Sequence, residues 1–163
     1  ELDAMAQVLE IKLREVLRED LGGTYGVGVG ASVTHYPEEG YQLTVSFGCD
    51  PARVEELTGV VFQQIDSLRT VPADTLYLTK VKEIRRRERE VDLKENGWWL
   101  GALKNAEYHR GDPRLILRYE ELVAGLSAED VRRTAAACFD TTRYARFVML
   151  PAEEGAAGAA QGP

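Results

Sequence analysis

Two runs of alternating apolar and polar residues constrain the fold of this chain more than any other feature. The apolar members are Tyr25, Val27, Val29, Ala31 and Val33 in the first run and Tyr41, Leu43, Val45, Phe47 and Cys49 in the second. Small and polar residues occupy the alternate positions. A period of two is typical of a half-buried strand, and the segment Pro37–Gly40 is long enough for a turn. We therefore predict an antiparallel hairpin over residues 24–50.

Helical patterns lie on both sides of this hairpin. Apolar residues three and four positions apart predict a helix over residues 2–20, which Gly22 and Gly23 end. After the hairpin, Asp50 is expected to cap a second helix and Pro51 to occupy its first position. The hairpin is thus expected to have helices available to cover it.

The rest of the chain predicts further helices and one final strand. Proline and glycine breaks separate helices predicted over residues 73–93, residues 98–109 and from residue 113 onward. Ser127 followed by Asp130 is typical of a capping box, so another helix is expected to reach about residue 138. Residues 143–150 alternate again, which predicts a last strand.

This order of elements predicts an α+β fold with two layers, a mostly antiparallel sheet covered by helices on one face. With 163 residues and 44% hydrophobic content, the chain can bury one core, and we place a single domain at residues 1–151. Three strands are few for so many helices. The domain is therefore expected to be truncated at its N-terminus, with at least one more strand before residue 1. The composition of residues 152–163 predicts a disordered tail.

Composition and motifs exclude several classes of function. A net charge of −7 argues against a nucleic-acid partner, and glutamates interleave the basic residues at positions 80–90, as on a salt-bridged helix face. No apolar run approaches the length of a membrane span, and the first residues do not resemble a signal peptide. Cys49 and Cys138 fit neither a metal knuckle nor a disulfide framework.

No complete catalytic motif is present in the sequence. His35 and His109 are expected at the surface, because zinc needs three or four converging ligands. The glycines at 26–30 resemble a dinucleotide fingerprint only superficially, since that motif runs from strand to helix and here a helix precedes a strand. No phosphate-binding loop and no serine nucleophile elbow occur.

The junction between the first helix and the hairpin is the one candidate site. Arg18 is expected in the last helical turn, and Tyr25 is expected to open the strand seven residues later. In one reading Arg18 complements the helix dipole and Tyr25 packs at a sheet edge. In the other, both side chains belong to a functional site. The glycines of the first strand are also open to two readings, close packing against a helix, which we favour, or room for an extended substrate.

The segment from Leu17 to Tyr25, an arginine and a tyrosine seven apart with glycines before the tyrosine, resembles a signature of the pitrilysin/insulinase family of zinc metallopeptidases. Three later segments are similar to that family in the same order. They are Cys49-Asp50-Pro51, Glu95-Asn96-Gly97-Trp98-Trp99-Leu100 and Leu126-Ser127-Ala128-Glu129-Asp130-Val131. The resemblance covers most of the chain and points to the C-terminal, non-zinc-binding half of these enzymes.

The resemblance implies a divided active site. In this family an H-x-x-E-H helix of the N-terminal half supplies the zinc and its catalytic glutamate, and the C-terminal half supplies an arginine and a tyrosine. Arg18 and Tyr25 match that pair, which implies catalytic and substrate-binding roles for both. The implied partners are a zinc-binding N-terminal half of the same protein and a peptide substrate. The implied zinc lies in that partner domain, so this chain alone should bind no metal and be inactive.

The same resemblance leaves an alternative open. Catalytically inactive halves of this fold serve as structural or scaffold subunits, in which Arg18 and Tyr25 would only pack. The resemblance also implies a bacterial enzyme. Its compartment is undecided between periplasm and cytoplasm, with the periplasm favoured.

Overall fold

The predicted hairpin is present in the computed structural model, which describes residues 1–151 apart from the Asp20 side chain. Strand β1 (Val27–Thr34) pairs antiparallel with β2 (Gly40–Phe47), with Val27 opposite Phe47 and Thr34 opposite Gly40. The two faces differ as the alternation predicts. The partly buried apolar residues of the hairpin pack against the core, whereas most of the small and polar residues of the other face are exposed.

The first helix has the predicted extent but changes its geometry near its end. Helix α1 (Leu2–Arg14) continues into a π-helical segment (Glu15–Asp20). Gly22 follows with a φ of 56°, in the left-handed region that glycine adopts without strain, and ends the helix as expected. The wider turn of the π-helix therefore lies directly before the hairpin.

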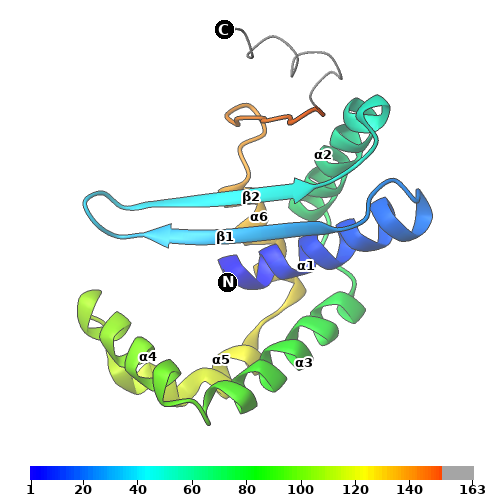
Figure 1. The fold of residues 1–163 in the computed structure, drawn as a ribbon. Helices are drawn as coiled ribbons and strands as arrows, with labels where there is room; N and C mark the ends of the chain where they lie inside the picture. The colour runs from blue at the N-terminus through cyan, green and yellow to red at the C-terminus, as the bar shows by residue number, and fades with distance from the viewer. Residues whose placement is uncertain (152–163) are drawn as a thin grey trace, which may run out of the picture.

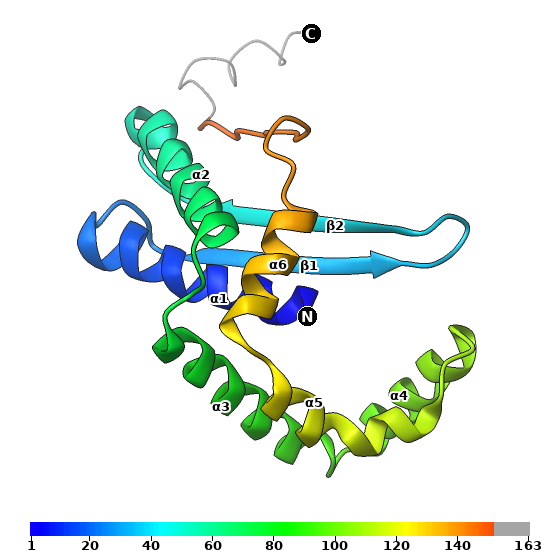
Figure 2. The same cartoon turned by 180° about the vertical axis from the view of Figure 1, so that it is seen from behind.

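The core forms where α1 packs against the hairpin together with α2 (Val54–Thr70) and α6 (Ala128–Cys138). Both α2 and α6 lie behind the hairpin in Figure 1 and in front of it in Figure 2, so they cover one face of the sheet. The largest side chains that are completely enclosed are Met5, Val8, Leu9, Leu13, Leu17, Leu57, Leu68, Val81 and Val131. The α+β class, with helices on one face of an antiparallel sheet, is confirmed.

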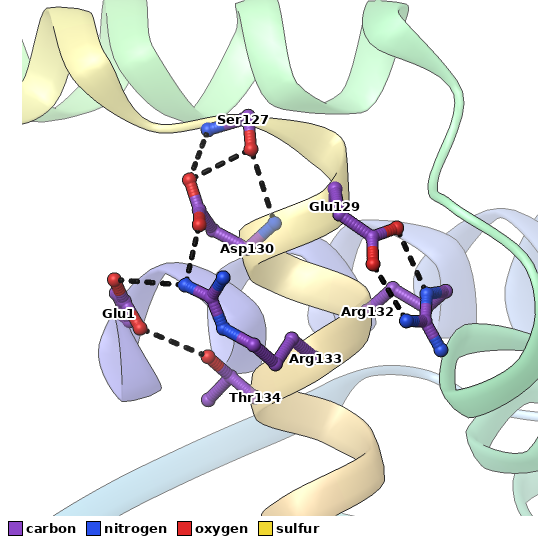
Figure 3. Close-up of polar contacts among 7 residues, drawn as sticks. All are labelled: Glu1, Ser127, Glu129, Asp130, Arg132, Arg133 and Thr134. Atoms are coloured by element: carbon purple, nitrogen blue, oxygen red, sulfur yellow. Dashed lines mark hydrogen bonds and ion pairs between the residues drawn. The ribbon is translucent and has the colours of Figure 1, made fainter.

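Polar contacts fix the start of α6 and join it to the start of α1 (Figure 3). The Ser127 hydroxyl accepts a hydrogen bond from the Asp130 backbone N–H at 3.1 Å, and the Asp130 carboxylate accepts one from the Ser127 N–H at 3.0 Å. This reciprocal pair is the predicted capping box. Arg133 then bridges Asp130, at 2.6 Å, and Glu1, at 3.6 Å.

Three further helical elements form a curved arm below the hairpin in Figure 1. Helix α3 (Thr75–Asp92) leads from the core to α4 (Asn96–Tyr108), a 3-10 segment (Pro113–Arg118) and α5 (Tyr119–Gly125). We call residues 96–125 the helical arm. Its far end contacts the hairpin loop, where the ring centroids of Tyr36 and Tyr108 are 5.3 Å apart.

The predicted final strand is not formed. Residues 143–150 have no strand pairing, because no strand of the described part of the chain lies where it could exchange backbone hydrogen bonds with them. An ion pair of 2.9 Å between Arg146 and Glu55 holds this segment on α2. The sheet therefore has two strands rather than three among residues 1–151. The domain limits and the strand before residue 1 stay predictions, and the predicted disordered tail, 152–163, lies outside the described residues.

Candidate functional site

Residues 18–26, here called the corner, join the π-helical segment to β1. Arg18 lies in the last helical turn, as predicted, and its side chain is exposed beside the fully buried Leu17. Two backbone hydrogen bonds close the turn, from Leu21 N–H to Val16 O at 3.1 Å and from Gly23 N–H to Leu17 O at 2.8 Å. Short π-helical segments occur frequently at functional sites.

Tyr25 lies two residues before β1, so the prediction that it opens the strand is wrong. The physical reason is that the Thr24 side chain, rather than a neighbouring strand, satisfies the backbone at this point. The Tyr25 side chain is 97% exposed. The reading in which Tyr25 packs at a sheet edge therefore does not hold within the described residues.

Thr24 is the residue of the corner that sequence reasoning missed. Its side chain is buried, and its Oγ1 lies 2.7 Å from the carbonyl oxygen of Gly48 and 2.8 Å from that of Gly26. The same oxygen accepts a hydrogen bond from the Gly26 N–H at 3.2 Å. The local signal was a threonine two residues before a glycine in a turn, where hydroxyls bond nearby backbone. The contact with Gly48 had no local signal.

Two more contacts join the corner to residues at the start of α2. Arg53 donates from Nη1 to the Leu21 carbonyl oxygen at 3.2 Å. Its other donors hold Glu56 at 2.9 and 2.7 Å, and these hydrogen bonds lower the pKa of the Glu56 carboxyl. A Cβ on Gly23 would lie 2.8 Å from Leu57 Cδ2, so a larger residue there would require the Leu57 side chain to shift. The backbone of the corner is thus fixed on several sides.

The two candidate side chains of the corner, Arg18 and Tyr25, have fewer contacts than its backbone. Among the side chains that the structure describes, none hydrogen-bonds to Arg18 or Tyr25. A guanidinium presents several N–H donors in a planar fork, and a phenol presents one O–H donor. The corner can therefore offer hydrogen-bond donors to carbonyl or carboxylate oxygens of a ligand. Arg18 carries a positive charge, and two acidic residues, Glu19 and Asp20, follow it in the corner.

The glycine-rich face of β1 continues from the corner and is open. A Cβ on Gly26 or Gly30 would meet no atom within 4 Å, and one on Gly28 would meet only Ser46 Oγ, at 3.5 Å. The expectation that a helix packs closely on these glycines is therefore wrong for residues 1–151. The small side chains leave the strand backbone accessible from this face.

A metal site is also absent from the described residues. Within the described residues, no group of three or more His, Cys, Asp or Glu side chains is arranged to hold a metal ion, so these residues do not fit a zinc site. His35 and His109 meet at the hairpin loop with ring centroids 5.6 Å apart, and His35 Nδ1 lies 3.1 Å from Glu39. None of the described helices is both long enough and apolar enough to cross a membrane.

Comparisons of the sequence and of the fold with known proteins both find peptidases. A family profile described as the peptidase M16 inactive domain matches residues 1–84, about half of the 163 residues. The probable zinc protease PqqL of Haemophilus influenzae is 36% identical over 64 residues, which are 39% of this chain and 7% of that protein.

Solved structures share the fold over most of the described residues. The periplasmic protease PqqL from Escherichia coli matches with a TM-score of 0.67 and 22% identity, over 82% of this chain and 15% of that chain. A protease from Helicobacter pylori matches with a TM-score of 0.69 and 16% identity, over 83% of this chain and 33% of that chain. The chain thus spans only a small part of the length of each of these relatives.

Proposed function

The chain belongs to the peptidase M16 inactive-domain family, and we propose that it is the substrate-binding, non-zinc domain in the C-terminal half of a zinc-dependent endopeptidase. The zinc and the general base lie in the N-terminal half of the same protein, and the substrate is a peptide. The observation that carries this proposal is the corner. It presents Arg18 and a 97% exposed Tyr25 from a backbone that the hydrogen bonds of Thr24 and Arg53 hold in place. Functional side chains commonly occupy loops that a rigid scaffold positions in this way.

Tyr25 stabilises the transition state in the proposed mechanism. Hydrolysis of a peptide bond passes through a tetrahedral intermediate with a developing negative charge on the former carbonyl oxygen. Zinc bound by the other half supplies Lewis-acid polarisation of that carbonyl and activation of the attacking water. The Tyr25 phenol donates a hydrogen bond to the same oxygen. Its exposure leaves the O–H group available when the two halves close.

Arg18 positions the substrate. Its guanidinium donates to a backbone carbonyl oxygen of the bound peptide, for which its fixed fork is suited. The open glycine face of β1 supports this arrangement, because an extended peptide can lie across it without meeting large side chains. Binding and transition-state contacts thus come from residues that are close together in the sequence, between Arg18 and β1.

The setting of the enzyme is also part of the proposal. A bacterial source and a periplasmic location are supported by the Escherichia coli relative, which is described as a periplasmic protease. Zinc is supported by the Haemophilus influenzae relative, which is named a probable zinc protease. Without its partner half, we expect the 163-residue chain neither to bind zinc nor to cleave peptides.

The test is Tyr25→Phe in the full-length protein, assayed on a fluorogenic peptide. We expect kcat to fall by about 100- to 1000-fold, since one such donor is worth about 3 to 4 kcal/mol. Zinc content and Tm should not change, because the Tyr25 side chain is 97% exposed. Tyr144→Phe, at a ring that is 61% exposed in another segment, is the matched control and should keep the wild-type kcat. Wild-type turnover by Tyr25→Phe would contradict the assignment.

A scaffold role is the competing function. It predicts that the full-length sequence lacks an H-x-x-E-H motif and that the purified protein hydrolyses no peptide with zinc supplied. An upstream H-x-x-E-H with a further downstream glutamate supports the peptidase instead.

A further inference from the structure

We propose that Thr24 is a positioning residue for Tyr25, whose buried hydroxyl sets where the phenol stands in the active site. This inference rests on the proposed function of Tyr25 and extends it to a second residue. Because Tyr25 is 97% exposed, no side chain of residues 1–151 packs around its ring to define its place. The position of the phenol then depends on its own rotamer and on the backbone that carries it.

The Thr24 hydroxyl holds that backbone on both sides of Tyr25. Thr24 directly precedes Tyr25, and its hydroxyl oxygen accepts a hydrogen bond from the N–H of Gly26, the residue that follows Tyr25, at 3.2 Å. Its single hydrogen has two carbonyl acceptors within reach, Gly26 at 2.8 Å and Gly48 at 2.7 Å. The Gly48 contact joins the corner to the end of β2, 24 residues away. One buried hydroxyl therefore fixes the local turn and also attaches it to the sheet.

The surrounding sequence makes this attachment necessary. Gly22, Gly23 and Gly26 flank Thr24 and Tyr25, and glycine leaves the backbone free to adopt many φ and ψ values. Loss of the hydroxyl would also remove the hydrogen bonds of Thr24 with Gly26 and Gly48, which lie at a partly buried position. A donor displaced by about 1 Å can cost about 100-fold in rate. A small movement of the corner is therefore sufficient to impair Tyr25.

The test combines Thr24→Val and Thr24→Ser with Tyr25→Phe in the full-length protein, each variant assayed for kcat and KM. Valine keeps the shape of threonine and removes the hydroxyl, whereas serine keeps the hydroxyl. We expect Thr24→Val to lower kcat by about tenfold or more with KM little changed, and Thr24→Ser to retain turnover. In the Tyr25→Phe background, Thr24→Val should change kcat by less than about twofold, because residues that act through one another are not additive.

The outcomes separate this inference from the proposed function. The same loss of kcat in both backgrounds would mean a general structural role for Thr24 and would overturn the inference. Full activity of Thr24→Val with a defective Tyr25→Phe would also overturn it, and would leave the role of Tyr25 intact. An active Tyr25→Phe would instead overturn the proposed function.

Amide hydrogen exchange of the full-length protein is the second measurement, independent of turnover. We expect faster exchange at residues 25–27 in Thr24→Val than in the wild type or Thr24→Ser, with α1 and α2 unchanged. Thr24→Ala takes the place of Thr24→Val if the valine variant does not fold. Unchanged exchange at residues 25–27 would show that the hydroxyl does not hold this backbone and would overturn the inference.

Discussion

The core region, residues 2–70, and the helical arm, residues 96–125, are held together in different ways. In the core region, completely enclosed side chains of α1 and α2 pack with the buried and partly buried apolar residues of the hairpin. In the arm, α4 has no buried residue, and Leu100 and Leu117 are 70% and 76% exposed. The family profile covers the whole core region and ends at residue 84, within α3. The difference teaches that the corner is built on the best-packed part of the molecule.

A buried cation of α3, Arg89, holds the arm in addition to the buried Val123 of α5. Arg89 is 6% exposed, and its guanidinium carbon lies 4.2 Å from the Trp98 ring centroid and 5.0 Å from that of Tyr119. It also donates to the Ile116 carbonyl oxygen at 2.6 Å. Arg89 thus joins α3 to α4, to the 3-10 segment and to α5.

The largest effect is expected in the core region. Leu13→Ala removes a completely enclosed side chain and should lower the free energy of unfolding by about 3 to 5 kcal/mol. Leu100→Ala, in the arm, should change it by less than about 0.5 kcal/mol, because Leu100 is already 70% exposed. Urea denaturation of the 163-residue chain, followed by far-UV circular dichroism, measures both. An equal loss of unfolding free energy in the two variants would contradict the difference between the core region and the arm.

A smaller and more local effect is expected at Arg89. Arg89→Met should weaken the arm by about 2 to 3 kcal/mol, through the lost cation–π contacts and the lost hydrogen bond. Both tryptophans of the chain, Trp98 and Trp99, lie in α4, so their fluorescence reports on the arm. The fluorescence transition in urea should therefore precede the circular dichroism transition.

The control for Arg89 is Arg87→Met, two residues along the same helix. The Arg87 side chain is 76% exposed and pairs with Glu83 at 2.9 Å, so its loss should cost less than about 0.5 kcal/mol. Coincident fluorescence and circular dichroism transitions in Arg89→Met would show that the arm and the core region unfold as one unit.

The smallest effect concerns the contact between the core region and α3, the helix that leads to the arm. Glu15, in the π-helical segment, accepts hydrogen bonds from Tyr77 at 2.7 Å and from Lys80 at 2.9 Å, both on α3. The Tyr77 hydrogen bond, followed by that from Lys80, lowers the pKa of Glu15 from 4.5. A carboxyl with a lowered folded-state pKa stabilises the fold above its unfolded pKa and loses this contribution as the pH falls through the folded value.

The free energy of unfolding of the wild type should therefore fall more steeply than that of Glu15→Gln as the pH is lowered below about 4.5. The difference should stay below about 1 kcal/mol, since the pair is partly exposed. Urea denaturation at several pH values measures it. Glu90→Gln, at an exposed carboxylate that bonds to no described side chain, should keep the wild-type slope. Parallel profiles for Glu15→Gln and the wild type would show that the contact of Glu15 with α3 does not contribute to stability.

The sequence predicted the core region better than the rest of the chain. Alternation is a local pattern that fixes which side chains share a face, so β1 and β2 could be predicted from it. Residues 143–150 carry the same pattern and still form no strand, because a strand also needs a neighbour to exchange hydrogen bonds with. Alternation shows that a segment can form a strand, whereas strand pairing depends on which segment lies beside it.

The same limit applies to the corner. Sequence alone selected Arg18 and Tyr25 as candidates and placed the end of the helix at Gly22, because residue type, spacing and glycine geometry are local properties. Only the tertiary structure placed Tyr25 before the strand with its ring exposed. Those features follow from the contact of Thr24 with Gly48 and of Arg53 with Leu21, which join segments 24 and 32 residues apart. Contacts between distant segments depend on how the whole chain packs, and no local pattern encodes them.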